Sequence, residues 1–363
     1  MTQYKSLYEY SGNSALLKQD KIKLSEYVSF KINTDVSDLN SGEFINISVK
    51  MSGSAISSPY EILYENYSLE FNHNNIKYTI KNMLMIEWKE VYLYSYNFKF
   101  KASEIISELI EKPDSIEYLI PNLLISYDEM KVDNEIINST NLSLNYKDNN
   151  LKVILEGNPD FNNNKIFSNS QLKNTLSTKI IFQINTDNYN FQYINSISKD
   201  LTELIGIAYG SFRPSIITKF YKNNLLIGEN LYSIKIDNSN KKLPLIPYQY
   251  SGVLSNFINE AFEKYISLNE IQKNEIKIIS QKVFESISSI DLKESFKILN
   301  SLYESIDMNE NKINLDNYLY KENDYKIFYS HINKLHKFLL SKLEYKGKYN
   351  NWSNILPNIE DLN

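Results

Sequence analysis

The side chains that could carry acid–base chemistry are few in this chain of 363 residues. It has three histidines, one arginine and no cysteine, so thiol catalysis, disulfides and cysteine-ligated metals are excluded within it. His331 and His336 lie five residues apart in one predicted helix, about 140° apart around its axis, so they cannot chelate one metal ion.

A second candidate is a loose nuclease-like spacing. Pro113-Asp114 is followed, after fourteen residues, by Glu129-Met130-Lys131. In restriction-type nucleases an Asp and a Glu hold Mg²⁺ while a Lys helps to activate water. The same spacing arises often by chance, and the helix-flanked core of such nucleases is missing around it. We therefore favour a strand and a turn here, and we predict no metal ion and no cofactor.

Aromatic and basic residues are mixed between positions 91 and 100. Tyr92, Tyr94 and Lys99 could stack bases and hold phosphates, and Arg213 is the one residue able to grip a phosphate with a bidentate fork. The alternation is strict, with an aromatic residue at every second position, and this pattern is typical of a strand that packs one face into a core. We favour the core interpretation and keep nucleic-acid binding as the alternative.

Composition and charge narrow the function classes further. The net charge is −5 and the pI about 5.5, which argues against a general nucleic-acid coat. The chain has no phosphate-binding glycine loop of the P-loop or dinucleotide type and no nucleophile elbow. It begins without a secretory pattern, and its apolar stretches fall short of the ~20 residues that span a bilayer. We expect a soluble, cytoplasmic protein that does not associate with membranes.

Periodicity predicts an α+β protein whose front is β-rich and whose back is helical. We expect an antiparallel sandwich or open barrel in residues 1–186, an α/β connecting region in 187–248 packed on it, and a helical bundle in 249–363. The expected strands lie near 26–32, 43–51, 61–71, 76–82, 91–100, 142–156 (a hairpin), 179–186, 215–221 and 229–236, with a polar loop at 157–174. The expected helices lie near 190–209, 253–266, 270–288, 292–306 and 327–343, with Gly210 ending the first.

The order of parts, together with FKILNSLYESI (296–306) and INKLHKFLLSKLEYKGKY (332–349), resembles the ApeA-type abortive-infection proteins. That family joins a β-rich N-terminal domain to a C-terminal HEPN helical domain. The resemblance implies that Glu304 occupies the helix in which the family places an acidic residue. HEPN ribonucleases use an R-x4-6-H motif, and this bundle contains no arginine, because Arg213 precedes it. Lys326 and His331 would be an atypical substitute.

Two functional hypotheses follow. The first is a non-catalytic or weakly catalytic, defence-associated sensor or adaptor that binds a protein or nucleic-acid ligand through its β-rich region. It would dimerise through its helical bundle or form a hetero-complex with a protein partner. The second is an RNA-cleaving HEPN-like nuclease with an atypical site built on Lys326, His331 and Glu304. A metal-dependent nuclease at Asp114, Glu129 and Lys131, and a purely structural interaction protein, are further alternatives.

Overall fold

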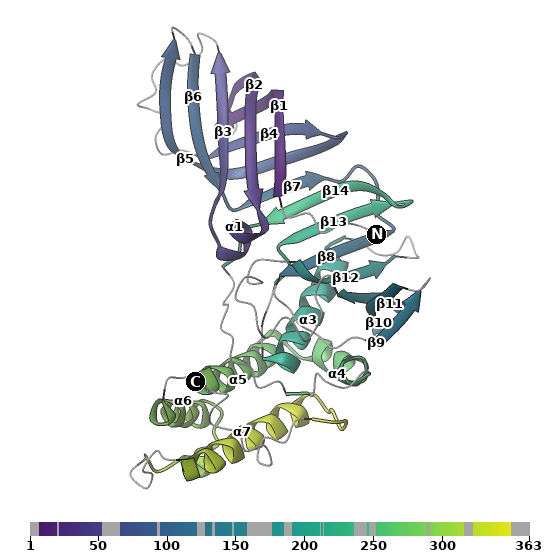
Figure 1. The fold of residues 1–363 in the computed structure, drawn as a ribbon, viewed down its shortest axis with the longest axis vertical. Coiled ribbons are helices and arrows are strands. Elements are labelled where there is room, and N and C mark those ends of the chain that lie inside the picture. Colours follow the sequence, from purple (N-terminus) through teal and green to yellow (C-terminus); the bar gives the residue numbers. More distant parts are fainter. Residues whose placement is uncertain are drawn as a thin grey trace. The chain divides into compact units, whose positions relative to one another are not determined.

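The computed structural model divides into two compact units, each described separately below (Figure 1). Unit 1 combines residues 1–124, 153–189 and 214–237, and unit 2 combines residues 125–152, 190–213 and 238–363. The structure describes residues 7–19, 22–52, 66–92, 95–121, 128–132, 135–146, 149–157, 176–184, 191–210, 212, 214–235, 245–246, 252–288, 291–315 and 322–349. The expected loop at 157–174 lies outside these ranges apart from Gly157, which ends a strand.

The N-terminal part of unit 1 is a six-stranded antiparallel barrel. Its strands are β1 (Leu7–Gln19), β2 (Ile22–Asp35), β3 (Ile45–Ser52), β4 (Tyr67–His73), β5 (Ile76–Tyr92) and β6 (Ser95–Ala102). They neighbour one another in the order β4-β1-β2-β3-β6-β5, and a further pairing of β4 with β5 closes the ring. The expected β-rich front is therefore confirmed. The sequence predicted a sandwich or an open barrel, and the structure has a closed barrel.

Alternating side chains fill this barrel. Tyr8, Val28, Ile47, Leu69 and Phe100 are all almost fully buried and belong to one continuous cluster. The short helix α1 (Val36–Ser41) follows β2, and a capping box formed by Asp35 and Asp38 begins it.

A second group of strands extends the sheet of unit 1. These strands are β7 (Glu104–Glu108), β8 (Ser115–Pro121), β11 (Asn149–Gly157), β12 (Leu176–Gln183), β13 (Ile217–Lys222) and β14 (Leu225–Tyr232). Their order is β5-β7-β14-β13-β8-β12-β11. The predicted strands at 179–186, 215–221 and 229–236 are confirmed within a few residues. β1, β7 and β8 were not predicted.

Two hairpins turn on asparagine pairs. Asn74 and Asn75 connect β4 to β5, and Asn223 and Asn224 connect β13 to β14. All four residues have positive φ, between 50° and 62°. Two-residue loops with both residues at positive φ match the right-handed twist of the strands, and Asn tolerates that conformation better than most residues. The turn predicted near Asn72–Asn75 is confirmed.

The strand predicted over 91–100 is wrong as a single element. β5 continues through Val91 to Tyr92, and β6 begins at Ser95, with Tyr92 opposite Ser95 in the ladder. A hairpin therefore interrupts the run. The period-2 pattern crosses it without a break, so pattern alone could not reveal the turn.

Unit 2 contains the strand pair β9 (Asp128–Val132) and β10 (Glu135–Tyr146) and most of the helices. Its helices are α3 (Phe191–Tyr209), α4 (Val253–Ser267), α5 (Glu270–Ser288), α6 (Leu292–Ser305), the 3₁₀ turn η3 (Asn309–Asn311) and α7 (Glu322–Lys342). All five long helices were predicted, and Gly210, at φ 64°, ends α3. Within the described ranges, no helix is both long and apolar enough to cross a membrane.

Candidate functional site

The predicted acid–base residue His331 lies between α6 and α7, where it meets Tyr303. The Tyr303 Oη atom is 2.9 Å from His331 Nδ1, and their rings meet edge to face at 5.6 Å. The amphipathic stripe of α6 buries Tyr303 completely, while His331 is half-buried on α7. The two residues are 28 positions apart, so helix packing brings them together.

Burial sets the protonation states of this pair. It lowers the pKa of His331 to about 4, with the nearby Lys334 charge as a second cause, and it raises the pKa of Tyr303 above its ordinary value. Both side chains are therefore neutral at pH 7. The bond between the phenol and Nδ1 can run in either direction, because the donor depends on the imidazole tautomer, and the phenol oxygen also lies 3.4 Å from the backbone carbonyl oxygen of His331. In both tautomers Tyr303 occupies Nδ1, which leaves Nε2 as the ring nitrogen without this bond.

The structure does not join the other predicted catalytic residues to this pair. Lys326 is exposed on α7. Glu304 is also exposed, and its Oε1 atom forms an ion pair of 2.7 Å with Lys312 Nζ. Among the described contacts, none links Lys326, His331 and Glu304.

The residues of the nuclease-like spacing, Asp114, Glu129 and Lys131, are divided between the two units. Asp114 Oδ2 accepts a hydrogen bond of 2.7 Å from the backbone N–H of Asn223, so this carboxylate caps the β13–β14 hairpin. Glu129 and Lys131 lie on β9 in the other unit, and their side chains are outside the described part of the structure. Asp114 thus has a role in unit 1 that the sequence did not suggest.

Of the predicted binding residues, Tyr92 ends β5 and Lys99 lies on β6. Phe98 and Phe100 are buried, as the core interpretation predicts for them, whereas Tyr96 is half-buried. Lys99 points outward and forms an ion pair of 2.7 Å with Glu87 across the ladder. Tyr94 and Arg213 lie outside the described residues, as does the side chain of Tyr92.

Two β-bulges interrupt the pairing of β5 with β6. The register skips Ile86, between Met85 and Glu87, and skips Val91, between Glu90 and Tyr92. Both skipped residues are exposed, Ile86 at 47% and Val91 at 39%, and Leu84 on the same strand is exposed at 59%. A bulge re-aims the side chain it releases from the ladder, so β5 presents apolar side chains to solvent.

The sequence analysis missed a charged network among α3, α4 and α5. Lys273 Nζ lies 2.8 and 2.9 Å from the two carboxylate oxygens of Asp200, and both side chains are buried. Glu203 accepts hydrogen bonds from Lys277, at 2.6 Å, and from the Tyr265 hydroxyl, at 2.8 Å. Burial raises the pKa of Asp200, and Lys273 opposes this shift. These pairs tie three helices together, and they come from positions more than 60 residues apart.

A second missed network crosses the extended sheet of unit 1. Lys219 on β13 stands directly opposite Glu117 on β8 and Glu229 on β14, and its Nζ atom is 3.6 Å from Glu229. The Tyr10 hydroxyl also donates to Glu229, at 3.0 Å, and Lys179 lies within 3.9 Å of Glu117. These side chains are largely buried, so the pairing satisfies charges that would otherwise be costly. Strand alternation placed them on one face, but nothing local in the sequence marks that face as charged and buried.

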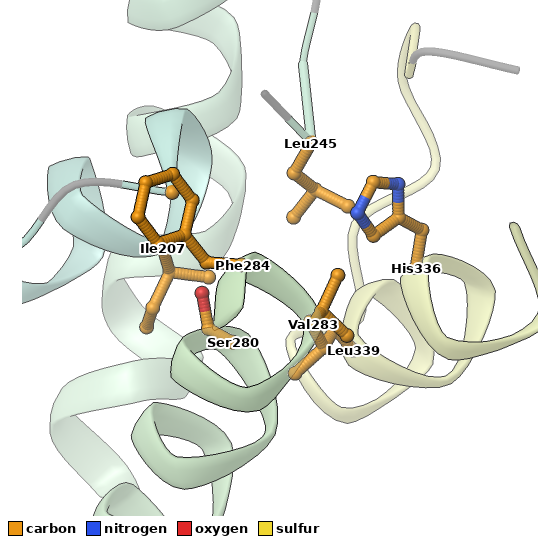
Figure 2. Close-up of a pocket in the computed structure, with 8 residues that line it drawn as sticks. Ile207, Leu245, Ser280, Val283, Phe284, His336 and Leu339 are labelled. Atoms are coloured by element: carbon orange, nitrogen blue, oxygen red, sulfur yellow. The ribbon is translucent and has the colours of Figure 1, made fainter. Parts of the chain in front are cut away.

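One small pocket in unit 2 is lined by His336 and residues of α3, α5 and α7 (Figure 2). Apart from His336 and Ser280, its lining side chains are apolar. His336 is 3% exposed, its Nδ1 atom has no hydrogen-bond partner, and burial lowers its pKa to about 4. The ring is therefore neutral at pH 7 and packs as part of the core. Among the described residues, no group of three or more acidic or histidine side chains could hold a metal ion.

Comparison with protein-family models, with curated proteins and with solved structures gives no match for this chain.

Proposed function

We propose that this protein is an adaptor that binds a protein partner through β5 of its β-rich unit. The observation that carries the proposal is the pair of bulges that direct Ile86 and Val91 outward. Exposed apolar side chains rimmed by charged residues, here Glu87 and Lys99, are typical of a protein interface. The defence-associated role, as a sensor within an ApeA-type system, rests on the resemblance in part order alone.

The protonation of His331 supports a binding role over a catalytic one. Its Nδ1 atom is hydrogen-bonded to the Tyr303 hydroxyl, and its pKa of about 4 removes the acid form at neutral pH. A general acid–base residue needs a pKa near the working pH. The pair instead serves to hold α6 against α7.

Self-association of unit 2 is the second part of the proposal. Ile271 and Ile278 on α5 are exposed at 80% and 49%, and they lie seven residues apart on one helix face. This spacing suits a helix–helix seam between two copies. Light scattering on the purified chain measures the mass, and we expect a dimer that dissociates in an Ile271→Gln/Ile278→Gln variant.

Co-purification from native-like expression tests the β5 interface. We expect one protein to remain bound to the wild type and to be lost from an Ile86→Thr/Val91→Thr variant, in which β-branched residues keep the strand propensity. A matched Leu225→Thr/Leu226→Thr variant changes two exposed apolar residues elsewhere in unit 1 and should retain the partner. Equal retention by all three proteins would refute the β5 site.

RNA cleavage at His331 is the alternative function, and one observation favours it. The Tyr303 hydroxyl fixes the ring of His331 through Nδ1, which leaves Nε2 as the ring nitrogen that could act on RNA. Incubation of labelled RNA with the wild type and with His331→Ala tests it. Cleavage that disappears in the variant would establish the nuclease, and cleavage that is unchanged or absent would remove it.

A further inference from the structure

The solvent face of α7 carries lysines without acidic residues among them. Lys326, Ser330, Lys334, Lys337 and Ser341 are all exposed, and we call them the lysine stripe. At 100° per residue they fall within about 80° of the helix circumference, and at about 1.5 Å per residue they extend over roughly 22 Å. The segment from 326 to 348 holds six lysines and one glutamate in a chain whose net charge is −5.

The lysines of the stripe differ from those of the neighbouring helices in their partners. Every lysine of α4 and α5 forms an ion pair with a carboxylate; these lysines are Lys264, Lys273, Lys277 and Lys282. In the described part of the chain, Lys326 and Lys337 have no such partner, and Lys334 contacts only the neutral side-chain oxygen of Asn311, at 3.3 Å. The stripe therefore keeps its positive charge available.

We propose that the lysine stripe of α7 binds the phosphate backbone of a nucleic acid. Three cations along one helix face match a linear polyanion, and the Ser330 hydroxyl between Lys326 and Lys334 can donate to a phosphate oxygen. At about 3.4 Å of axis per phosphate, the stripe spans on the order of six phosphates of one strand. The stripe offers no side chain that reads a base, so the binding is independent of sequence. This site lies in unit 2, and it goes beyond the protein interface proposed for β5.

Counterion release gives the proposal a quantitative signature. Each phosphate contact to a single strand contributes about −0.7 to the slope of log affinity against log salt, so three lysines contribute about −2. Between 50 and 200 mM salt this slope corresponds to roughly a 16-fold loss of affinity. A stripe that serves only solubility would show no such dependence.

The experiment measures fluorescence anisotropy of a labelled 12-nucleotide oligouridylate with the full chain across this salt range. We expect the wild type to show the slope of about −2 and the variant Lys326→Gln/Lys334→Gln/Lys337→Gln to lose it. Gln and Lys have similar helix propensity, so α7 should persist, and circular dichroism checks this. The matched control Lys31→Gln/Lys50→Gln/Lys81→Gln removes the same charge from exposed positions of unit 1 and should bind as the wild type does.

Three results would overturn the proposal. The first is no binding by the folded wild type at 50 mM salt, and the second is an equal slope in the stripe variant. The third is tighter binding to a polyglutamate peptide of equal charge, which would assign the stripe to an acidic protein partner. Loss of protein co-purification in the β5 variant is measured separately, so failure of one proposal leaves the other standing.

Discussion

Tyr303 on α6 and His331 on α7 share a hydrogen bond of 2.9 Å between the phenol oxygen and imidazole Nδ1. The contact gives α6 and α7 a specific polar link, and burial together with the Lys334 charge keeps this half-buried histidine neutral at pH 7. His331, the candidate residue for RNA cleavage, therefore has a partner and a burial that suit helix packing. The predictions below start from this pair.

Replacing Tyr303 by Phe removes the hydroxyl and keeps the ring. We expect a loss of about 1 kcal/mol of unfolding free energy, the usual net value of such a bond. The pKa of His331 should stay near 4, because burial and the Lys334 charge lower it and the change leaves both in place. Chemical denaturation measures the loss of stability, and NMR titration of the histidine ring protons measures the pKa. Tyr325→Phe, a change on α7 itself, is the control and should cost no comparable stability.

Acid should weaken the fold through His336. Its pKa is about 4 when folded and 6.5 when exposed, so between these values the unfolded chain binds one more proton. The contribution of His336 to the unfolding free energy is therefore fully present above pH 6.5. It is lost as the pH falls to 4, and the loss is roughly 3 kcal/mol. Urea unfolding at pH 7 and pH 4.5 measures it, and His336→Gln should reduce the dependence and leave the share of His331, whose pKa is also lowered to about 4. An unchanged pH profile in that variant would contradict the assignment.

Replacing only one partner of the buried ion pair between Asp200 and Lys273 should lower the unfolding free energy strongly. Lys273→Met leaves a buried carboxylate without its cation, and we expect a loss of about 3–5 kcal/mol. Adding Asp200→Asn removes the charge left behind and should restore most of that loss. A double-mutant cycle by chemical denaturation measures the coupling. Additive effects would show that the two side chains act independently.

The asparagine turns make a prediction about backbone conformation. Asn224 has φ 62°, so Asn224→Ala should cost about 1–2 kcal/mol, while Asn224→Gly should be neutral or stabilising. The same pair of changes at Asn75 should repeat the result in the β4–β5 hairpin. Thermal unfolding of the four variants distinguishes this account from one based on the lost side chain, which would make Gly as harmful as Ala.

Much of the secondary structure could be read from the chain because its signals are local. The five long helices follow apolar stripes at 3–4 spacing, and the buried faces of α4 and α6 consist of the residues in those stripes. The turn at Asn74 and Asn75 follows from a residue type that tolerates positive φ. The division into a β-rich front and a helical back needs nothing more than these patterns.

The contacts that define the candidate sites depend on distant parts of the chain meeting. β5 ends at Tyr92 and β6 begins at Ser95 within a pattern that alternates without a break, and the bulges at Ile86 and Val91 arise from the ladder with β6. Periodicity reports which residues share a face, and it carries no information about which face of another element they meet. Closure of the barrel by β4 and β5, the Lys273–Asp200 pair and the Tyr303–His331 bond were therefore settled by packing in three dimensions, whereas the order and type of the elements were already present in the sequence.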